Sequence, residues 1–300
     1  MTQRALITGV TGFLGSRLAR SLNADGVEVH AIVRPASHLD RIPDLEGRVQ
    51  LHVDDGSMGA VRDAFSVADP EVCFHLATHF VAEHNSDDVP ALADANVAFG
   101  MRVAEAAAQV PRRVFVNAGT AWQHVDGEPY RPKGLYAATK QAFEDVLRYY
   151  ADADQLHVVT LNLYDSYGPD DPRGKLVSAL VNAARSGKHL DMTSGRQLID
   201  LVHVDDVVRA FSHAFSLARG MPFCEARAFA VSSGQAVSLR ELVGIVEAIL
   251  GHPLDVTWGA REDRANEMLT PWYAGDPLPG WSPRIKLVDG LGALLEEAPA

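Results

Sequence analysis

The chain has 300 residues, of which 47% are hydrophobic and 22% are charged, and its formal net charge is −12. This length is enough for one large domain or two small ones with a well-buried core. The negative charge argues against nucleic acid as a partner, because nucleic-acid binding depends on basic surface. An anionic nucleotide ligand would have to be captured by local features rather than by the overall field.

Signals for targeting and for membrane insertion are the next features to consider. The first residues lack a charged segment followed by an apolar signal-peptide core. No uninterrupted apolar stretch reaches the roughly 18 residues that a membrane helix needs. Cys73 lies in an apolar run, which favours a buried thiol over a disulfide. We therefore expect a cytoplasmic protein that binds no membrane.

The first half of the chain alternates short β-branched runs with longer helical patterns. The apolar runs lack a clean alternation of polar and apolar residues, as is typical of strands buried on both faces. Strands that alternate with helices predict an α/β fold, a doubly wound parallel (Rossmann) sheet. The expected strands cover residues 5–8, 27–33, 49–53, 72–76, 113–117 and 157–163, and the expected helices cover 12–22, 60–65, 91–109 and 136–150.

The composition changes after about residue 163, where Pro, Gly and Asp become frequent. Helical patterns return at 175–186, 204–218 and 239–250, and residues 253–283 are rich in Pro, Gly and Trp. We expect a dinucleotide-binding domain over residues 1–165, to which residues 200–220 return. Residues 166–199 and 221–300 are expected to form a smaller C-terminal α/β substrate-binding region.

A glycine-rich turn follows the first expected strand and opens the first expected helix. Its sequence, Thr8-Gly9-Val10-Thr11-Gly12-Phe13-Leu14-Gly15, has the spacing G-x-x-G-x-x-G. A pyrophosphate requires backbone N–H groups at a helix N-terminus and no Cβ in the way. Gly9, Gly12 and Gly15 are expected to supply the tight turn, the close approach and the close helix–strand packing. The turn therefore predicts a dinucleotide site.

The end of the second strand bears on the choice of cofactor. An acidic residue there would bind the ribose 2′-OH of NAD, whereas this strand ends in Val33-Arg34. A guanidinium pairs with a 2′-phosphate through parallel hydrogen bonds. Arg34, helped by Ser37 or Arg41, therefore favours NADP, although NAD stays open and a solvated surface arginine is the plainer alternative.

Tyr136 and Lys140 open the helix expected after the fifth strand, and they share one helix face because they are four residues apart. A phenol has an ordinary pKa near 10 and is a poor base at neutral pH. A neighbouring ammonium group lowers that pKa by stabilising the phenolate. The pair predicts proton transfer by Tyr136, with Lys140 tuning it and binding the nicotinamide ribose.

Taken together, these motifs resemble the extended short-chain dehydrogenase/reductase family, which comprises NAD(P)-dependent epimerases, dehydratases and reductases of nucleotide sugars. The resemblance covers nearly the whole chain. Besides the glycine turn, Tyr136 and Lys140, it rests on His75-Leu76-Ala77, Asn96, Tyr167-Gly168-Pro169, the segment 201–207 and the segments 232–234 and 238–241.

The resemblance implies further residues at the cofactor. An acidic residue after the third strand would bind the adenine amine, and either Asp54 or Asp55 fits that position. The remaining residues that the resemblance places at the cofactor are Thr11, Phe13, Leu14, Leu76, Ala77, Thr78, Asn96 and Asn117.

In this family a Ser or Thr after the fifth strand hydrogen-bonds the reacting oxygen. The resemblance places that position at Ala118, which has no hydroxyl. Thr120 is the nearest candidate and Asn117 an outside one. Dehydratases of the family place an acidic pair beside this hydroxyl, whereas the neighbours here are Gly119 and Ala121, so a dehydratase is disfavoured.

Other departures lie where the family binds nucleotide and sugar. Asp165 stands where the family has Asn, and Ile199 stands where Arg is expected, with Arg196 upstream. Arg261 resembles the family's arginine at the sugar diphosphate. The residues expected at the substrate are Thr78, Thr120, Trp122, Asp165, Arg196 and Arg261.

The segment 117–123, Tyr136 and the segment 198–206 look most like reductases related to the CDP-abequose synthases. The leading hypothesis is NADPH-dependent reduction of a nucleotide-linked 4-keto-6-deoxyhexose, with Tyr136 as proton donor and Thr120 orienting the oxygen. A nucleotide-sugar 4-epimerase that uses NAD is the alternative. A non-catalytic NADP-binding scaffold or sensor is the alternative of another class.

Two partner questions remain at this stage. His75 and His79 are four residues apart, but no third ligand is evident, so no metal is expected. The helical segments 91–109 and 136–150 correspond to the pair through which the family dimerises, and the resemblance implies a homodimer.

Overall fold

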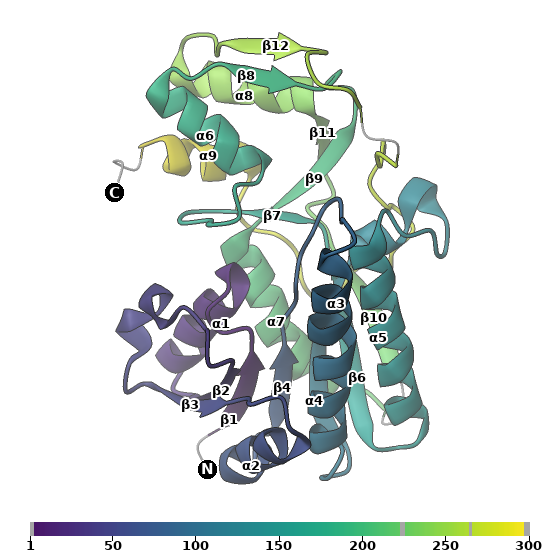
Figure 1. Cartoon of the computed structure of the whole chain (residues 1–300). Helices are drawn as coiled ribbons and strands as arrows, with labels where there is room; N and C mark the ends of the chain where they lie inside the picture. The colour runs from purple at the N-terminus through teal and green to yellow at the C-terminus, as the bar shows by residue number, and fades with distance from the viewer. Residues whose placement is uncertain (1–2, 223–225, 264–265, 297–300) are drawn as a thin grey trace.

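A seven-stranded sheet forms the larger lobe of the protein, here described from a computed structural model that covers residues 3–222, 226–263 and 266–296 (Figure 1). The strand order is β10-β6-β5-β4-β1-β2-β3, and every neighbouring pair is parallel. This confirms the predicted doubly wound parallel sheet. The strands are β1 (Arg4–Thr8), β2 (Glu28–Val33), β3 (Val49–Val53), β4 (Val72–His75), β5 (Arg113–Thr120), β6 (Leu156–Leu163) and β10 (Ala226–Val231).

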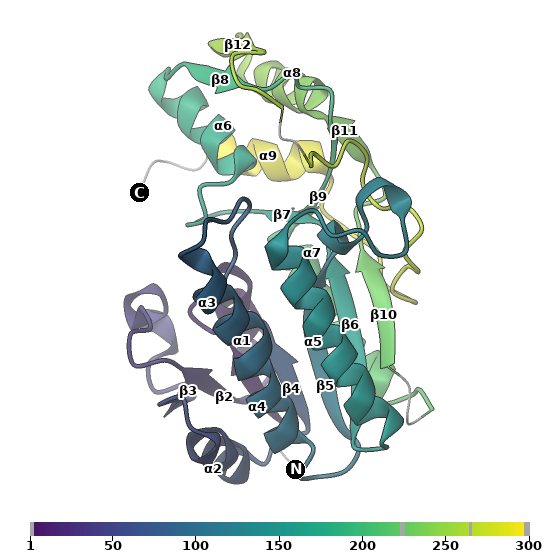
Figure 2. The same ribbon diagram turned by 45° about the vertical axis from the view of Figure 1, so that its right-hand side comes forward.

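Helices cover both faces of this sheet (Figure 2). One face carries α1 (Phe13–Ala24) and α7 (Val204–Ala218), and the other carries α2 (Met58–Ala68), α4 (Phe99–Ala107) and α5 (Leu135–Asp152). The short helix α3 (Asp88–Ala93) continues into α4 through a π-helical turn, Asp94–Ala98. Burial between two helical layers leaves both faces of the central strands dry.

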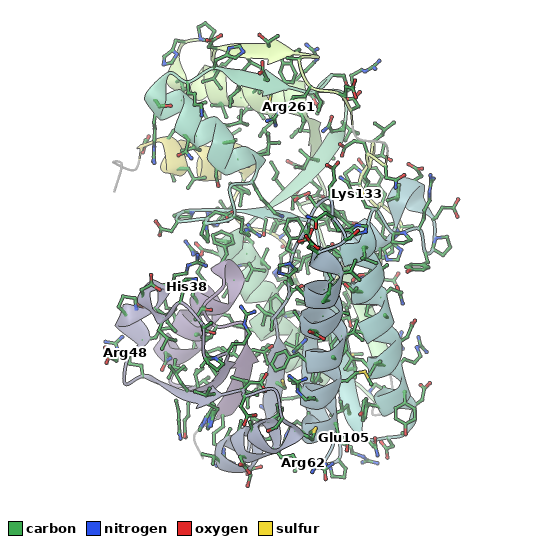
Figure 3. The ribbon with its side chains drawn as sticks, viewed as in Figure 1. His38, Arg48, Arg62, Glu105, Lys133 and Arg261 are labelled. Atoms are coloured by element: carbon green, nitrogen blue, oxygen red, sulfur yellow. The ribbon has the colours of Figure 1, made fainter. Side chains whose placement is uncertain are left out.

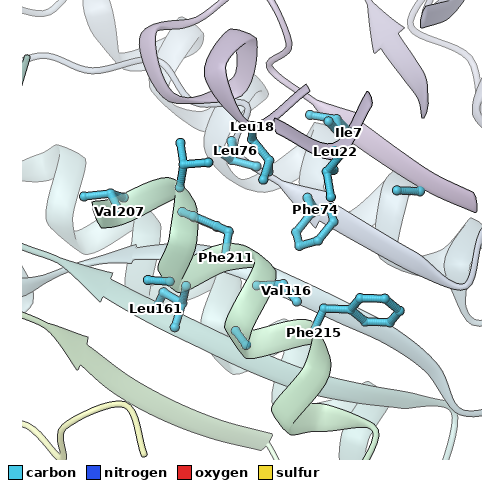
Figure 4. Packing of buried hydrophobic residues seen from close by; sticks show 14 of the residues in the cluster. Ile7, Leu18, Leu22, Phe74, Leu76, Val116, Leu161, Val207, Phe211 and Phe215 are labelled. Carbon is cyan, nitrogen blue, oxygen red and sulfur yellow. The ribbon is translucent and has the colours of Figure 1, made fainter. Parts of the chain in front are cut away.

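The apolar strand sequences follow from this two-sided burial. In β4, Cys73 packs into the cluster beneath α2, α4 and α5, whereas the next residue, Phe74, packs into the cluster beneath α1 and α7. Phe74 meets Phe211 and Phe215 of α7 edge to face, with ring centroids 6.4 and 6.3 Å apart (Figure 4). Successive side chains alternate between the faces of a strand, so a strand covered on both sides is apolar throughout.

A smaller lobe stands over the carboxyl ends of the strands (Figure 1). Its strands form a sheet of β11 (Ala236–Ser238), β9 (Leu198–His203) and β7 (Asp165–Tyr167), and a pair of β12 (Val256–Trp258) and β8 (Leu190–Met192). Its helices, α6 (Leu176–Ser186), α8 (Leu239–Leu250) and α9 (Leu287–Glu296), share a separate apolar cluster with Tyr167 and Leu201. The two lobes meet at the carboxyl edge of the sheet, where open α/β sheets bind ligands.

The structure differs from the predicted division of the chain at β10. Residues 221–300 were expected to lie outside the sheet, but Ala226–Val231 pairs with β6 as the seventh strand. The strand is at the edge, and only its last three residues are buried, so its sequence carries a weaker apolar signal than the central strands. Helix α7 packs under the sheet as expected for residues 204–218, whereas residues 200–203 belong to β9 of the smaller lobe.

Within the described ranges, no helix is both long and apolar enough to cross a membrane. Cys73 is a buried free thiol in β4, and burial raises its pKa well above the ordinary value. Cys224 lies outside the described residues.

Candidate active site

The glycine turn joins β1 to α1 at the carboxyl edge of the sheet. Gly9 has φ +79°, and the Gly12 N–H donates to the Gly9 carbonyl oxygen at 3.0 Å. A Cβ on Gly15 would lie 2.1 Å from that same carbonyl oxygen, and a Cβ on Gly9 would lie 2.7 Å from the amide nitrogen of Ala77. Glycine is required at both positions, because a side chain would collide with backbone.

The first turn of α1 fits an anionic ligand. Its N-cap residue, Gly12, offers no side-chain hydrogen bond, and the first turn holds no acidic residue. The first N–H groups of a helix have no acceptor within the helix, and the helix dipole favours negative charge at this end. Phe13 and Leu14 lie in this turn and Thr11 directly precedes its N-cap, so the predicted pyrophosphate cradle is consistent with the local geometry.

The residues predicted to bind the adenosine follow β2 and β3. Arg34 directly follows β2 and is exposed, and its backbone N–H donates to the Ser37 hydroxyl at 3.0 Å. Asp54 is buried and accepts from Arg102 at 3.1 Å and from the Gly56 N–H at 3.0 Å. Asp55 is exposed and accepts from the Ser57 N–H. Of the two carboxylates, Asp55 is the more accessible to a ligand.

Tyr136 and Lys140 lie in the first turns of α5, beneath the smaller lobe. Tyr136 is half-buried and Lys140 is 2% exposed. Burial raises the pKa of Tyr136 to about 12, against the lowering effects of a hydrogen bond with Thr78 and of the charge on Arg173. Burial lowers the pKa of Lys140 to about 8, which the Glu144 carboxyl partly offsets. The phenol is therefore protonated at neutral pH in this structure.

Asn96 is buried in the π-helical turn and has no free hydrogen-bonding capacity. Its Oδ1 accepts from the Thr78 hydroxyl at 2.9 Å and from the His79 N–H at 2.7 Å. Its Nδ2 donates to the His79 carbonyl at 3.0 Å and to the Thr139 hydroxyl at 2.9 Å. Asn96 thus ties the loop after β4 to α5, and its predicted contact with the cofactor stays a prediction.

The hydroxyl expected after β5 is engaged elsewhere. Thr120 is 6% exposed and caps the 3-10 turn Ala121–Gln123, where its Oγ1 accepts from the Trp122 N–H at 3.3 Å. The Gln123 side chain accepts in return from the Thr120 N–H at 3.1 Å. Thr120 therefore has a structural role that its sequence position did not reveal, and its predicted contact with the reacting oxygen stays a prediction.

Sequence reasoning missed a polar contact between the buried Gln123 and the half-buried Glu144 of α5. Gln123 Nε2 donates to Glu144 Oε1 at 3.0 Å, and burial raises the pKa of Glu144 to about 7. Glu144 lies one turn after Lys140, so the i, i+4 spacing from Lys140 is the signal that could have found it.

Three aromatic rings pack around one another at the amino end of α5. Phe80 meets Tyr136 edge to face at 5.0 Å between centroids and lies 5.5 Å from Trp122. The Lys133 ammonium lies 4.4 Å from the Trp122 ring centroid, and that of Lys175 lies 5.0 Å from the Phe80 ring centroid. We call Phe80, Trp122 and Tyr136 the aromatic wall.

Both lysines beside the aromatic wall are ion-paired. Lys133 pairs with Glu267 at 2.8 Å, and Lys175 pairs with Asp165 at 3.1 Å. Figure 3 shows Lys133 close to the amino end of α5. The carboxylate at Asp165 thus has a local cation to neutralise it, which accounts for Asp at a position where Asn was expected. Neither lysine has a sequence motif that marks it.

The loop from β7 to α6 reaches the glycine turn. The Arg173 guanidinium lies 4.3 Å from the Phe13 ring centroid and is fixed by Asp171 and by Ser166. Its charge also acts on Tyr136. Arg173 therefore stands between the anion cradle and the phenol, and only the tertiary structure reveals it.

The other predicted site residues lie farther from Tyr136 or deeper in the sheet. Arg196 and Arg261 are exposed in the smaller lobe, where Figure 3 shows Arg261 well above Lys133. Asn117 is fully buried in β5, and its Nδ2 donates to the Thr160 hydroxyl at 3.3 Å. Leu76 and Ala77 directly follow β4, and the Ala77 N–H donates to the Thr8 hydroxyl at 3.2 Å.

This geometry matches a known family. Residues 5–222 fit the family model described as the NAD dependent epimerase/dehydratase family. The chain belongs to this family. The predicted extended short-chain dehydrogenase/reductase membership and the NAD(P)-dependent enzyme class are confirmed.

Relatives of this epimerase/dehydratase family member differ in the reaction that they catalyse. A UDP-glucose 4-epimerase of Mycolicibacterium smegmatis is 31% identical over 317 aligned residues, which cover 98% of this chain and 97% of the relative. A CDP-abequose synthase of Salmonella typhimurium is 24% identical and covers 99% and 98%. Among solved structures, MoeE5 in complex with UDP-glucuronic acid and NAD is 25% identical, with a TM-score of 0.80 and 98% of both chains covered.

Proposed function

We propose that this protein reduces the 4-keto group of a nucleotide-linked 6-deoxyhexose with NADPH. The observation that carries the proposal is the placement of Tyr136. The glycine turn packs against Ala77, and three residues later in the same loop the Phe80 ring packs edge to face against the Tyr136 ring at 5.0 Å. The loop after β4 therefore contacts both the anion cradle and Tyr136.

The chain's own residues account for the proton and the alignment. The nicotinamide, when bound, supplies the hydride. Tyr136 donates a proton from its hydroxyl to the carbonyl oxygen, as its protonated state at neutral pH allows. Lys140 lies one helical turn after Tyr136 and, with a pKa of about 8, is charged at neutral pH, so we propose that it stabilises the phenolate that this leaves. Binding of both reactants at the carboxyl edge of the sheet, where the lobes meet, would hold them together, which removes part of the entropic barrier.

Removal of the phenol hydroxyl tests the proton donor. Tyr136→Phe keeps the ring of the aromatic wall, so NADPH binding should be kept while kcat falls by about 10²- to 10⁴-fold. Steady-state kinetics with a 4-keto sugar nucleotide and fluorescence titration with NADPH measure the two effects. A variant that keeps most of its turnover contradicts the assignment. A wild-type protein that binds NADPH but turns over no keto sugar would favour the scaffold alternative.

The preference for NADP rests on Arg34. Its exposed position after β2, the Ser37 hydroxyl in the same turn and the lack of an acidic residue at this strand end support a 2′-phosphate. Arg34→Ala should raise the KM for NADPH by about 10- to 100-fold, corresponding to one charge-assisted contact, and leave the KM for NADH nearly unchanged. A wild-type enzyme that prefers NADH removes this part of the proposal.

The aromatic wall supports a deoxy sugar. Its rings offer apolar surface beside the phenol, and the two nearby ammonium groups are already paired with carboxylates, so a sugar carboxylate would find no unpaired lysine there. The similarity to CDP-abequose synthases supports the same substrate class. A thermal-shift screen with CDP-, dTDP-, UDP- and GDP-linked sugars identifies the nucleotide, since specific binding raises the apparent stability.

A 4-epimerase is the second candidate, and the 31% identity to a UDP-glucose 4-epimerase favours it. Such an enzyme must oxidise its sugar first and would need Tyr136 as a base. The cofactor in the purified protein separates the two: tightly held, stoichiometric NAD supports the epimerase, whereas exchangeable NADP supports the reductase.

We also propose a homodimer that forms through α4 and α5. Met101 on α4 and Tyr149 on α5 are 46% and 64% exposed. Both helices lie on the same outer side of the sheet (Figure 2). Apolar surface of this kind commonly marks a protein–protein interface.

A further inference from the structure

The phenol of Tyr136 has a hydroxyl partner that comes from a different strand than expected. Thr78 stands three residues after the end of β4, in the loop whose Phe80 ring packs edge to face against the Tyr136 ring at 5.0 Å, and interaction with the Thr78 side chain lowers the pKa of the phenol. The two candidate positions near the end of β5 make no such contact: Ala118 lacks a hydroxyl, and the Thr120 Oγ1 accepts from the Trp122 N–H.

A chain of three hydrogen bonds links the Thr78 side chain to the backbone of Tyr136. The Thr78 hydroxyl donates to Asn96 Oδ1 at 2.9 Å, and Asn96 Nδ2 donates to the Thr139 hydroxyl at 2.9 Å. The Thr139 hydroxyl in turn donates to the Tyr136 carbonyl at 2.8 Å. This chain links Thr78 through Asn96 to the backbone of the first turn of α5, so the Thr78 hydroxyl cannot move away from this turn without breaking a hydrogen bond.

Asn96 lies in an irregular turn of its helix. Asn96 is 1% exposed and lies in the π-helical turn Asp94–Ala98. Single π turns within α-helices are frequent at functional sites. The turn lets Asn96 satisfy both ends of its amide, two bonds to the loop after β4 and one to α5 among them.

We propose that Thr78, held by Asn96, is the hydroxyl that positions the Tyr136 phenol and stabilises its deprotonated form. This inference deepens the proposed function, because it concerns the same proton transfer. While the phenol is protonated, Tyr136 donates to Thr78 and Thr78 donates to Asn96. After the phenol proton has gone to the substrate oxygen, the Thr78 hydroxyl turns to donate to the phenolate oxygen. Thr78 is a positioning residue, since it acts through Tyr136.

The test compares Thr78→Val, which removes the hydroxyl and keeps the shape, with Thr78→Ser, which restores it. Thr120→Val tests the competing hydroxyl, and Thr257→Val, on the exposed face of β12, is the matched control. Loss of one hydrogen bond to a charged oxygen should raise the pKa of Tyr136 by about one to two units. In T78V the alkaline limb of the pH profile of kcat for reduction should move to higher pH by that amount. The value of kcat should fall about 10- to 100-fold with little change in KM. T78S should recover most of the loss.

A second readout does not depend on turnover. The tyrosinate absorbance of the NADP⁺ complex, with that of Tyr136→Phe subtracted, reports the pKa of Tyr136 directly. The upward shift in T78V and its reversal in T78S are expected even if no keto sugar is a substrate, so failure of the proposed function and failure of this inference are distinguishable. An unshifted titration in T78V, with a normal thermal midpoint, overturns the inference. So does a shift that appears in T120V and not in T78V.

Discussion

Lys140 and Glu144 show what burial does to single side chains at this site. Both lie on α5 within one turn of each other, and burial moves the pKa of each toward its neutral form, to about 8 and to about 7. Each group would otherwise be charged at neutral pH, and the protein opposes those charges by desolvation. The Glu144 carboxylate partly offsets the lowering of the Lys140 pKa.

Glu144→Gln should therefore change how stability depends on pH. A folded-state pKa raised from 4.5 to about 7 means that the folded protein binds this proton more tightly than the unfolded chain does. This proton binding contributes to the free energy of unfolding. The contribution is fully present below pH 4.5 and is lost as the pH rises through about 7. Denaturant unfolding across this pH range should show that the free energy of unfolding falls with rising pH in the wild type and does not fall in this way in E144Q.

The exposed Glu46→Gln serves as the control and should keep the wild-type fall. In E144Q the pKa of Lys140 should also drop further, because its carboxyl partner is gone. A pH dependence of stability in E144Q that matches wild type would show that Glu144 is not the group titrating.

At the scale of elements, glycine is required by packing in one helix and is not required in another. Gly15 lies in α1, where a Cβ would collide with the Gly9 carbonyl oxygen, whereas Gly244 lies exposed in α8 with open space around its Cβ position. Helix propensity alone favours Ala over Gly by about 1 kcal/mol at either site. At Gly15 the collision outweighs this preference, so replacement by alanine is expected to destabilise the protein.

Gly15→Ala and Gly244→Ala form a matched pair. G244A should raise the free energy of unfolding by about 0.5–1 kcal/mol and leave NADPH affinity unchanged. G15A should distort the turn and weaken NADPH binding by about 10²-fold or more, since backbone must move by over 1 Å. Chemical denaturation and fluorescence titration give both numbers. Full NADPH affinity in G15A would refute the close-packed turn.

At the scale of the whole molecule, the outer face of α4 and α5 is the surface that we assign to the dimer. Met101→Glu combined with Tyr149→Glu places charge on two exposed apolar positions. If the dimer forms there, the molar mass from light scattering at micromolar concentration should fall by half. Val67→Glu on α2 is the control, because Val67 is 60% exposed on a different helix, and it should keep the dimer mass. A wild-type monomer refutes the proposal.

The sequence by itself determined the parallel sheet, most helix positions, the glycine turn and the Tyr136–Lys140 pair. Each of these is encoded locally, by apolar runs, by helical periodicity or by residues within one turn of each other. The sequence did not predict β10, because this edge strand buries only part of its length. Phe80, Lys133 and Arg173 meet Tyr136 or its neighbours only because separate segments converge at the carboxyl edge of the sheet. Thr78 was expected at the ligands, but its interaction with Tyr136 depends on the same convergence. Contacts between distant segments depend on packing, and no local pattern in the chain records them.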